Sequence, residues 1–140
     1  MRFLLLLLLT TLTFVTGSAQ DLTGRWEGTF RFGNMKITFS NVYLTFTSSP
    51  DGYYVLSSRR GQYIDDSDTT VSFNVKFQTK GKNRLFLDED KLISPDTLKK
   101  ICYTSYRLRI RTAHNQTLLE GRYFQRNCNE ASDIFFRKVE

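Results

Sequence analysis

Polar and apolar side chains alternate along most of this chain, and the alternation limits the fold more than any other feature. In residues 22–32, Leu, Gly, Trp and Phe occupy every second position, while Thr, Arg and Glu lie between them. Residues 71–77 repeat the pattern with Val and Phe. Successive side chains of a β-strand point to opposite faces, so these segments predict strands with one buried face and one exposed face.

Similar segments recur along the chain, separated by turn residues such as Gly, Asn, Asp and Pro. They predict about eight strands, at residues 22–32, 35–47, 53–59, 69–79, 84–87, 101–112, 117–125 and 132–139. In the second segment the apolar positions change from odd to even numbers near Ser40 and Asn41. A shift of one residue moves every side chain to the other face, so we expect a β-bulge at these two residues. Residues 88–100 show no regular pattern and predict an irregular connection.

Two segments near the C-terminus predict their own register. The inward positions 106, 108 and 110 match the inward positions 119, 121 and 123 when Ile110 lies opposite Leu119. This register leaves His114 and Asn115 as a two-residue turn, and Asn tolerates the positive φ angles that such turns require. The two segments are therefore expected to form a tight β-hairpin.

The first 19 residues have the features of a secretory signal peptide. A short basic start precedes the apolar run at residues 4–9, and small residues stand before Gln20. The apolar run is too short for a membrane-spanning helix, although an uncleaved anchor remains an alternative. We expect cleavage before Gln20 and export to a periplasm or out of the cell. The mature chain, residues 20–140, is expected to form one domain without a transmembrane segment.

Cys102 and Cys128 are the two cysteines of the chain. An even number of cysteines in an exported chain favours a disulfide bond, and the hairpin register places Cys102 beside Cys128. Metal binding by the two thiolates is the alternative, but no further Cys or His lies near them in the sequence. We therefore expect a disulfide bond across the open end of the hairpin.

An even set of short strands joined by tight turns is typical of an up-and-down antiparallel sheet. Closing such a sheet into a barrel removes its two exposed edges. The predicted fold is all-β, a single antiparallel barrel of about eight strands without a C-terminal helix; a two-sheet sandwich is the alternative. The inward aromatic side chains Phe73, Phe77, Tyr106 and Tyr123 are the predicted wall of a ligand cavity, and plain core packing is the alternative role for them.

The stretch Gly24-Arg25-Trp26 resembles the G-x-W signature of the calycin superfamily, which contains lipocalins, fatty-acid-binding proteins and avidins. The resemblance implies that Trp26 closes one end of the barrel, that an Arg of the last strand packs over the indole, and that any pocket opens at the opposite end. Arg137 is the candidate for this cation–π contact. We also expect the inward glycines, Gly24 and Gly28, to leave room for the indole.

The chain departs from these families in several respects. It contains no T-D-Y motif, which is typical of lipocalins, and no segment that predicts the lipocalin helix after the last strand. Avidins lack that helix, but they line the biotin site with several Trp residues, and Trp26 is the only Trp here. Overall, the chain resembles small secreted lipocalin-like proteins of Bacteroidetes-type bacteria.

Candidate catalytic and metal-binding residues are sparse. His114, the only histidine, falls in the predicted exposed turn, which lacks the buried surroundings of a catalytic triad. The acidic clusters at residues 65–68 and 88–90 lack the spacing of a calcium loop and predict solvated loop charge. No glycine-rich phosphate loop occurs. We expect no enzymatic activity, no cofactor and no metal site; a hydrolase with paired carboxylates is the least favoured alternative.

The formal net charge of +6 is a mild basic excess. Arg107, Arg109 and Arg111 lie on one side of a predicted strand, with Arg122 on the neighbouring strand, and the alternation places them outside. A solvated outer face is favoured over a site for anionic glycans or lipid head groups. No nucleic-acid partner is expected, because the aromatic side chains face the other way.

The predicted function is binding without catalysis, with a small apolar or amphipathic ligand held in the barrel cavity. The alternative is a protein-binding or inhibitor barrel that recognises a partner through loops at residues 60–68 and 88–95.

Overall fold

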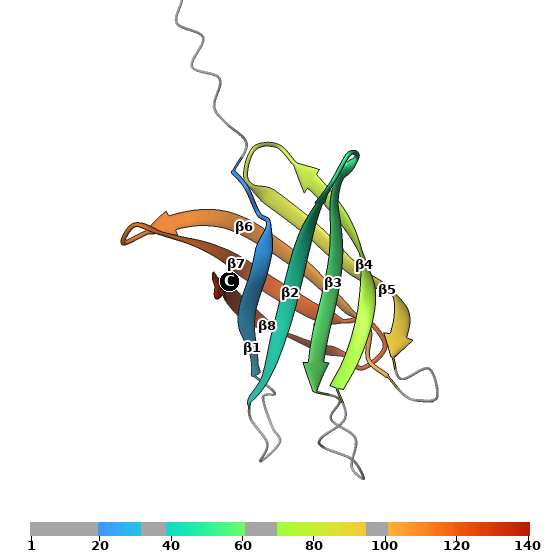
Figure 1. Ribbon diagram of the computed structural model, residues 1–140. Helices are drawn as coiled ribbons and strands as arrows, with labels where there is room; N and C mark the ends of the chain where they lie inside the picture. The colour runs from blue at the N-terminus through green and yellow to red at the C-terminus, as the bar shows by residue number, and fades with distance from the viewer. Residues whose placement is uncertain (1–19, 32–38, 61–69, 95–100) are drawn as a thin grey trace, which may run out of the picture.

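The computed structural model describes residues 20–31, 39–60, 70–94 and 101–140, and these residues form a closed barrel of eight antiparallel strands (Figure 1). The strands are β1 (Gly24–Arg31), β2 (Phe39–Ser49), β3 (Gly52–Arg60), β4 (Thr70–Lys80), β5 (Arg84–Ser94), β6 (Thr104–Ala113), β7 (Gln116–Gln125) and β8 (Glu130–Lys138). Each strand pairs with the next along the chain, and β1 pairs with β8. The predicted all-β, up-and-down barrel is confirmed, and the described residues contain no helix.

The alternation of side chains places the apolar residues inside the barrel. In β2, for example, Val42, Leu44 and Phe46 are buried, while the residues between them are partly exposed. Aromatic and β-branched side chains suit such a pleated surface that is buried on one face. Removing this apolar face from water is the main favourable contribution to folding.

The bulge predicted at Ser40 and Asn41 does not form. β1 and β2 pair without a register shift along all eight residues of β1, and this pairing includes both Ser40 and Asn41. β2 begins at Phe39, and Ile37 lies outside the described residues. The change from odd-numbered to even-numbered apolar positions therefore falls at the start of β2, where it causes no register shift.

β5 is longer than the sequence predicted. We expected a short strand that stops at Leu87, but β5 is 11 residues long. Its pairing with β4 contains two register shifts, at which Asp90 and Ile93 have no opposite residue. An extra residue turns the side chains beyond it to the opposite face of the sheet. Leu87 and Leu92 therefore both face the inside of the barrel, although one has an odd number and the other an even number. The two bulges hide the alternation that would have predicted the full strand.

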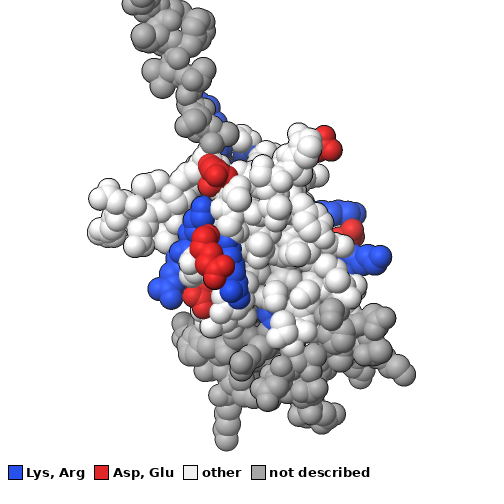
Figure 2. All heavy atoms as spheres, viewed as in Figure 1, with Lys and Arg blue, Asp and Glu red and all other residues white. Residues whose placement is uncertain are grey.

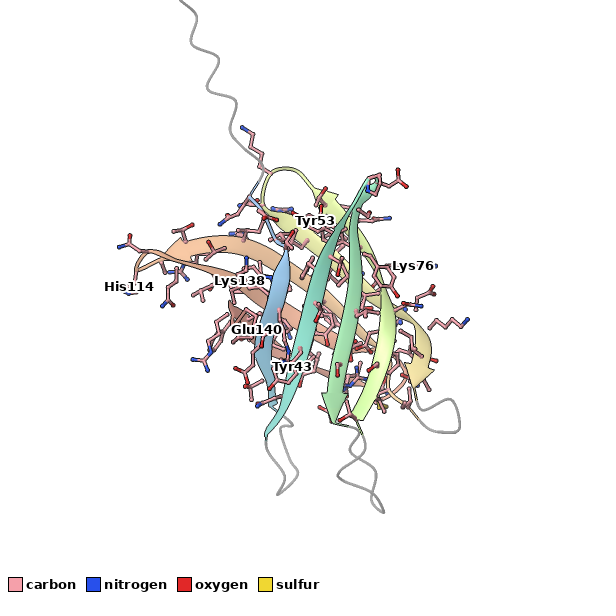
Figure 3. All side chains as sticks on the ribbon, viewed as in Figure 1. Tyr43, Tyr53, Lys76, His114, Lys138 and Glu140 are labelled. Atoms are coloured by element: carbon pink, nitrogen blue, oxygen red, sulfur yellow. A yellow bond between two sulfur atoms is a disulfide. The ribbon has the colours of Figure 1, made fainter. Side chains whose placement is uncertain are left out.

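The hairpin of β6 and β7 has the predicted register. Ile110 lies opposite Leu119, and the pairing continues without a shift along both strands. His114 and Asn115 form the turn with φ angles of 50° and 61°, and these positive values are those that a type I′ turn requires. Figure 3 shows His114 at the tip of this hairpin, away from the body of the barrel.

The predicted disulfide bond joins Cys102 to Cys128, with their Cα atoms 5.8 Å apart. It links the residues that precede β6 to the turn between β7 and β8. The Asn127 side chain adds two hydrogen bonds across the same gap: its Oδ1 accepts from the Tyr103 backbone N–H at 2.8 Å, and its Nδ2 donates to the Ile101 carbonyl at 2.6 Å. The segment at residues 101–103 is thereby attached to the β7–β8 turn.

The two ends of the barrel differ in their connections. At the end where β1 begins, short turns join β2 to β3, β4 to β5, and β6 to β7 (Figure 1). At the opposite end, longer connections at residues 32–38, 61–69 and 95–103 follow β1, β3 and β5. Residues 1–19, the predicted signal peptide, lie outside the described residues. Among the residues that are described, no helix is long and apolar enough to span a membrane.

Candidate functional site

The barrel end that contains Trp26 is filled by side chains. Trp26 is 1% exposed, and its Nε1 donates a hydrogen bond to the Leu22 carbonyl at 2.9 Å. The backbone N–H of Leu22 in turn donates to the Tyr53 hydroxyl at 3.0 Å, and Figure 3 shows Tyr53 at this end. Tyr53, Phe46 and Phe77 pack edge to face, with ring centroids 5.6 to 5.9 Å apart. These side chains form an apolar plug at the short-turn end of the barrel.

Arg137 does not pack over Trp26, as the resemblance implied. β8 pairs with β1 so that Lys138 lies opposite Trp26 and Arg137 lies opposite Glu27. The Lys138 ammonium is 5.9 Å from the centroid of the indole. Arg137 points outward, its side chain is 66% exposed, and its Nη2 is 3.4 Å from Glu27 Oε2. Because neighbouring residues of a strand point to opposite faces, the register of β8 gives the contact with the indole to the lysine.

Gly24 and Gly28 make room for the C-terminal residues of the chain. A Cβ atom on Gly28 would lie 2.7 Å from the Phe136 ring, and one on Gly24 would collide with the Glu140 carbonyl oxygen. Gly24 also has a φ of 123°, which side-chain-bearing residues rarely adopt. The small size of the two glycines therefore lets the C-terminal residues approach the first strand, and the expected room for the indole stays a prediction.

A polar cluster lies inside the barrel, toward the end with the longer connections. Its members, which we call the Arg59–Glu89 cluster, are Ser57, Arg59, Glu89 and Thr104, and their exposed fractions range from 0% to 7%. β3 supplies the first two, β5 supplies Glu89, and Thr104 begins β6. Ser57 and Arg59 follow Val55 at steps of two residues, so the alternation that buries Val55 also turns them inward.

The Glu89 carboxylate joins the members of the cluster. Its Oε1 accepts hydrogen bonds from the Ser57 hydroxyl at 2.6 Å and from Arg59 Nη1, and its Oε2 accepts one from the Thr104 backbone N–H at 2.8 Å. Arg59 Nη2 donates to the Cys102 carbonyl. The buried carboxylate is therefore satisfied by three donors, and its ion-pair partner reaches the segment that the disulfide bond holds.

Aromatic side chains border the Arg59–Glu89 cluster. The Arg59 guanidinium lies 4.6 Å from the centroid of Phe73, and Phe73 meets Tyr103 edge to face with centroids 5.3 Å apart. Burial raises the pKa of the Tyr106 phenol well above its ordinary value, and the charge of Glu89 raises it further. Tyr106 therefore stays protonated near neutral pH, and its hydroxyl can donate as well as accept a hydrogen bond.

Three of the four predicted wall residues share the larger apolar cluster, in which Phe77 packs against the buried members, and Phe73 lies apart from it. Tyr106 and Tyr123 lie directly opposite each other on β6 and β7, and both are fully buried. Phe73 belongs to a separate, smaller apolar cluster, while Phe77 belongs to the apolar plug. Phe73 and Tyr106 border the Arg59–Glu89 cluster, whereas Phe77 lies near the opposite end of the barrel.

The members of this cluster were not predicted from the sequence, although part of the signal was present. Ser57 and Arg59 continue the inward positions of β3, and Glu89 continues those of β5 after Leu87. Glu89, together with Asp88 and Asp90, was interpreted as solvated loop charge, because these residues lack the spacing of a calcium loop. That expectation is wrong for Glu89, whose partner Arg59 precedes it by 30 residues.

Other charged side chains lie on the outer wall, as expected for the arginines of β6 and β7. Arg107 and Arg122 form ion pairs there with Asp88 at 3.0 Å and with Asp133 at 3.8 Å. Basic and acidic side chains also lie side by side on the face shown in Figure 2. Within the described ranges, no group of three His, Cys, Asp or Glu side chains could hold a metal ion; the acidic residues 65–68 lie outside those ranges.

The Arg59–Glu89 cluster can recognise a polar group by hydrogen bonding. A carboxylate accepts hydrogen bonds, a guanidinium donates them, and the hydroxyls of Ser57 and Thr104 do both. These groups lie beside the rings of Phe73 and Tyr103. A few polar groups among apolar and aromatic walls are typical of a small-molecule site.

In comparisons with known protein families, with curated proteins and with solved structures, the chain matches none of them. Its function is therefore inferred from the geometry of the barrel alone.

Proposed function

We propose that this protein is a non-catalytic binding protein that holds a small apolar or amphipathic ligand inside its barrel. The observation that carries the proposal is the Arg59–Glu89 cluster, a buried ion pair with buried hydroxyls in a mostly apolar interior. A buried ion pair contributes little net stability, because desolvation of the charges offsets their attraction. A few polar groups among apolar walls do, however, orient a bound ligand.

The position of the cluster favours an amphipathic ligand that enters from the end opposite Trp26. The apolar plug occupies the short-turn end, and the cluster lies between this plug and the end with the longer connections. A ligand that enters there would place its polar group at the Arg59–Glu89 cluster. Its apolar part would pack against Phe73 and Tyr103, which border the cluster.

As part of the same proposal, we assign the chain to the small secreted lipocalin-like proteins of the calycin superfamily, of the Bacteroidetes type. The closed eight-stranded barrel and the Gly24-Arg25-Trp26 start at a closed end support this assignment. The disulfide bond supports export to a periplasm or to the outside of the cell, because such bonds persist in oxidising compartments.

The alternative, a protein-binding or inhibitor barrel that acts through residues 60–68 and 88–95, has less support. Residues 88–94 belong to strand β5 rather than to a loop. Glu89, the second residue of this stretch, points inward and is fully buried. Of the two expected recognition loops, the second is therefore mostly a strand, and residues 61–68 of the first lie outside the described residues.

Two neighbouring serines of β3 provide a matched test of the ligand site. Ser57 faces the cluster, whereas Ser58 faces outward and pairs with Tyr43 and Ser72 on the neighbouring strands. We expect 11-dansylaminoundecanoic acid, an amphipathic fluorescent probe, to bind the wild-type protein. Ser57→Ala should weaken this binding on the order of 5–10-fold, the equivalent of one hydrogen bond, and Ser58→Ala should leave it unchanged.

Native mass spectrometry of the protein purified from its own source is the second test. A recurring small-molecule adduct would support the proposal. A folded protein that carries no adduct and binds neither the amphipathic probe nor the apolar probe N-phenyl-1-naphthylamine would contradict it. A protein that co-purifies in place of a small molecule would favour the alternative function.

A further inference from the structure

A row of three cations crosses the outer wall of the barrel. Lys80 of β4 lies directly opposite Arg84 of β5, and Arg84 lies directly opposite Arg109 of β6. All three side chains are exposed. Like charges that face each other on neighbouring strands destabilise a sheet. This arrangement therefore lowers the stability of the barrel, and nothing in the fold requires it.

The three cations differ from Arg107 and Arg111 on the same wall, because those two arginines form ion pairs with acidic side chains. Within the described part of the chain, Lys80, Arg84 and Arg109 form no ion pair. Glu120 lies directly opposite Arg109 on β7, yet both of its oxygens accept hydrogen bonds from Arg111, at 3.1 and 3.0 Å.

The row borders a groove of about 400 Å³ on the outer surface, near the β4–β5 turn. The charged and aromatic side chains that line it are Arg84, Phe86, Arg107, Arg109 and Glu120. The Phe86 ring holds two of the nearby cations in place, with the Lys80 ammonium 4.5 Å and the Arg107 guanidinium 4.6 Å from its centroid. Positive charge is therefore gathered around a concave surface.

The acidic groups that face the groove do not neutralise it. Glu120 is engaged by Arg111, and Asp88 is engaged by Arg107 at 3.0 Å. Lys80, Arg84 and Arg109 remain as an excess of positive charge. The backbone beneath them is well fixed, because the Ile110 N–H donates a hydrogen bond to the Asn83 carbonyl at 2.8 Å and so attaches the β4–β5 turn to β6.

We propose that this groove binds the phosphate or sulfate ester of a small soluble molecule, with the anionic oxygens between Arg84 and Arg109. A guanidinium group presents N–H donors in a planar fork that matches two oxygens of such an anion. The anion would also remove the repulsion between the two facing arginines. This outer site is separate from the site proposed inside the barrel and does not depend on it.

The first experiment titrates the full exported chain with inorganic phosphate and with sulfate, while NaCl keeps the ionic strength constant. Two-dimensional ¹H–¹⁵N NMR should show saturable shifts of the amides around Arg84 and Arg109. Arg109→Gln should weaken the binding by about 10-fold or more, the loss expected for a charge-assisted pair of hydrogen bonds. Arg122→Gln removes the same charge from the same wall outside the groove, and it should change the affinity less than about 2-fold.

The stability of the two variants at low salt tests the repulsion itself. Arg109→Gln should raise the midpoint of urea unfolding in low-salt buffer, because it removes a charge that faces Arg84. Arg122 also faces a cation, Arg107, but these two arginines have the acidic partners Asp133 and Asp88, so Arg122→Gln should not raise the midpoint. Addition of phosphate should stabilise the wild type more than the Arg109→Gln variant.

Three results would overturn the proposal. The first is an equal loss of anion binding in both variants, which would indicate attraction by net charge alone. The second is an absence of saturable shifts at the groove with either anion. The third is binding that occurs only on phosphatidylcholine vesicles supplemented with phosphatidylserine and never with the free anions, since the groove is proposed to take a soluble ester.

Discussion

The Glu89 side chain shows how one residue can control the interior of a small barrel. It is fully buried, it accepts hydrogen bonds from Ser57, Arg59 and Thr104, and these donors come from two other strands. Arg59 is buried as well and forms an ion pair with the same carboxylate. Each charge therefore stabilises the other inside the barrel, because an isolated buried charge is strongly unfavourable.

The loss of one member of this pair should be costly. We predict that Glu89→Gln lowers the free energy of unfolding by roughly 3–5 kcal/mol, because it removes one charge of a buried ion pair. Urea unfolding followed by circular dichroism measures this change. Asp90→Asn is the matched control: Asp90 lies 3.4 Å from Lys76 on the outer wall, and its loss should cost less than about 1 kcal/mol. Equal effects of the two substitutions would contradict the central role of the buried pair.

The β6–β7 hairpin shows how an element depends on one position that must stay small. Gly121 of β7 lies opposite Leu108, and a Cβ atom at this position would collide with the Arg107 carbonyl oxygen. The obstacle is backbone, which cannot rotate away as a side chain can. The glycine therefore permits the close approach of the two strands on which the predicted register depends.

We predict that Gly121→Ala lowers the free energy of unfolding by about 1–3 kcal/mol or more, the usual range for overpacking. Urea unfolding measures the loss, and amide hydrogen exchange should show faster opening of β6 and β7 than of β2 and β3. Arg122→Ala changes the next residue, an exposed one, and should cost less than about 1 kcal/mol. A Gly121→Ala variant as stable as the wild type would show that the strands can separate at this point without cost.

The molecule as a whole has one filled end and one end that depends on long-range links. At the filled end, the plug around Trp26 packs within the largest apolar cluster. At the other end, the segment at residues 101–103 is held by Arg59, by Asn127 and by the bond between Cys102 and Cys128. Removing the disulfide should therefore affect both the global stability and this end of the barrel.

We predict that the double variant Cys102→Ser, Cys128→Ser loses roughly 3–4 kcal/mol of stability. The two cysteines are 26 residues apart, and the chain-entropy model assigns a cost of this size to a loop of that length. Guanidinium unfolding of the oxidised wild type and of the double variant measures the difference. The reduced wild type should match the double variant, and a loss below about 1 kcal/mol would show that the hydrogen bonds of Asn127 alone hold the segment.

Much of the fold follows from local patterns in the sequence. The alternation of apolar side chains, the turn residues and the two cysteines predicted the barrel, the β6–β7 register and the disulfide bond, because each of these signals acts between neighbours in one strand or across one hairpin. The candidate site was harder to predict from the sequence than the fold was. Phe73 and Tyr106 were chosen for facing inward, and they border the Arg59–Glu89 cluster that the sequence analysis missed.

Only the tertiary structure decided which charges meet and where the alternation is interrupted. Arg59 and Glu89 belong to strands that are not adjacent, and nothing local to either residue indicates that the other will neutralise it. The bulges at Asp90 and Ile93 turn later residues of β5 inward. The register of β8 against β1 places Lys138, rather than Arg137, over Trp26. In each case the outcome depends on contacts between distant parts of the chain, and a local pattern of side chains contains no information about them.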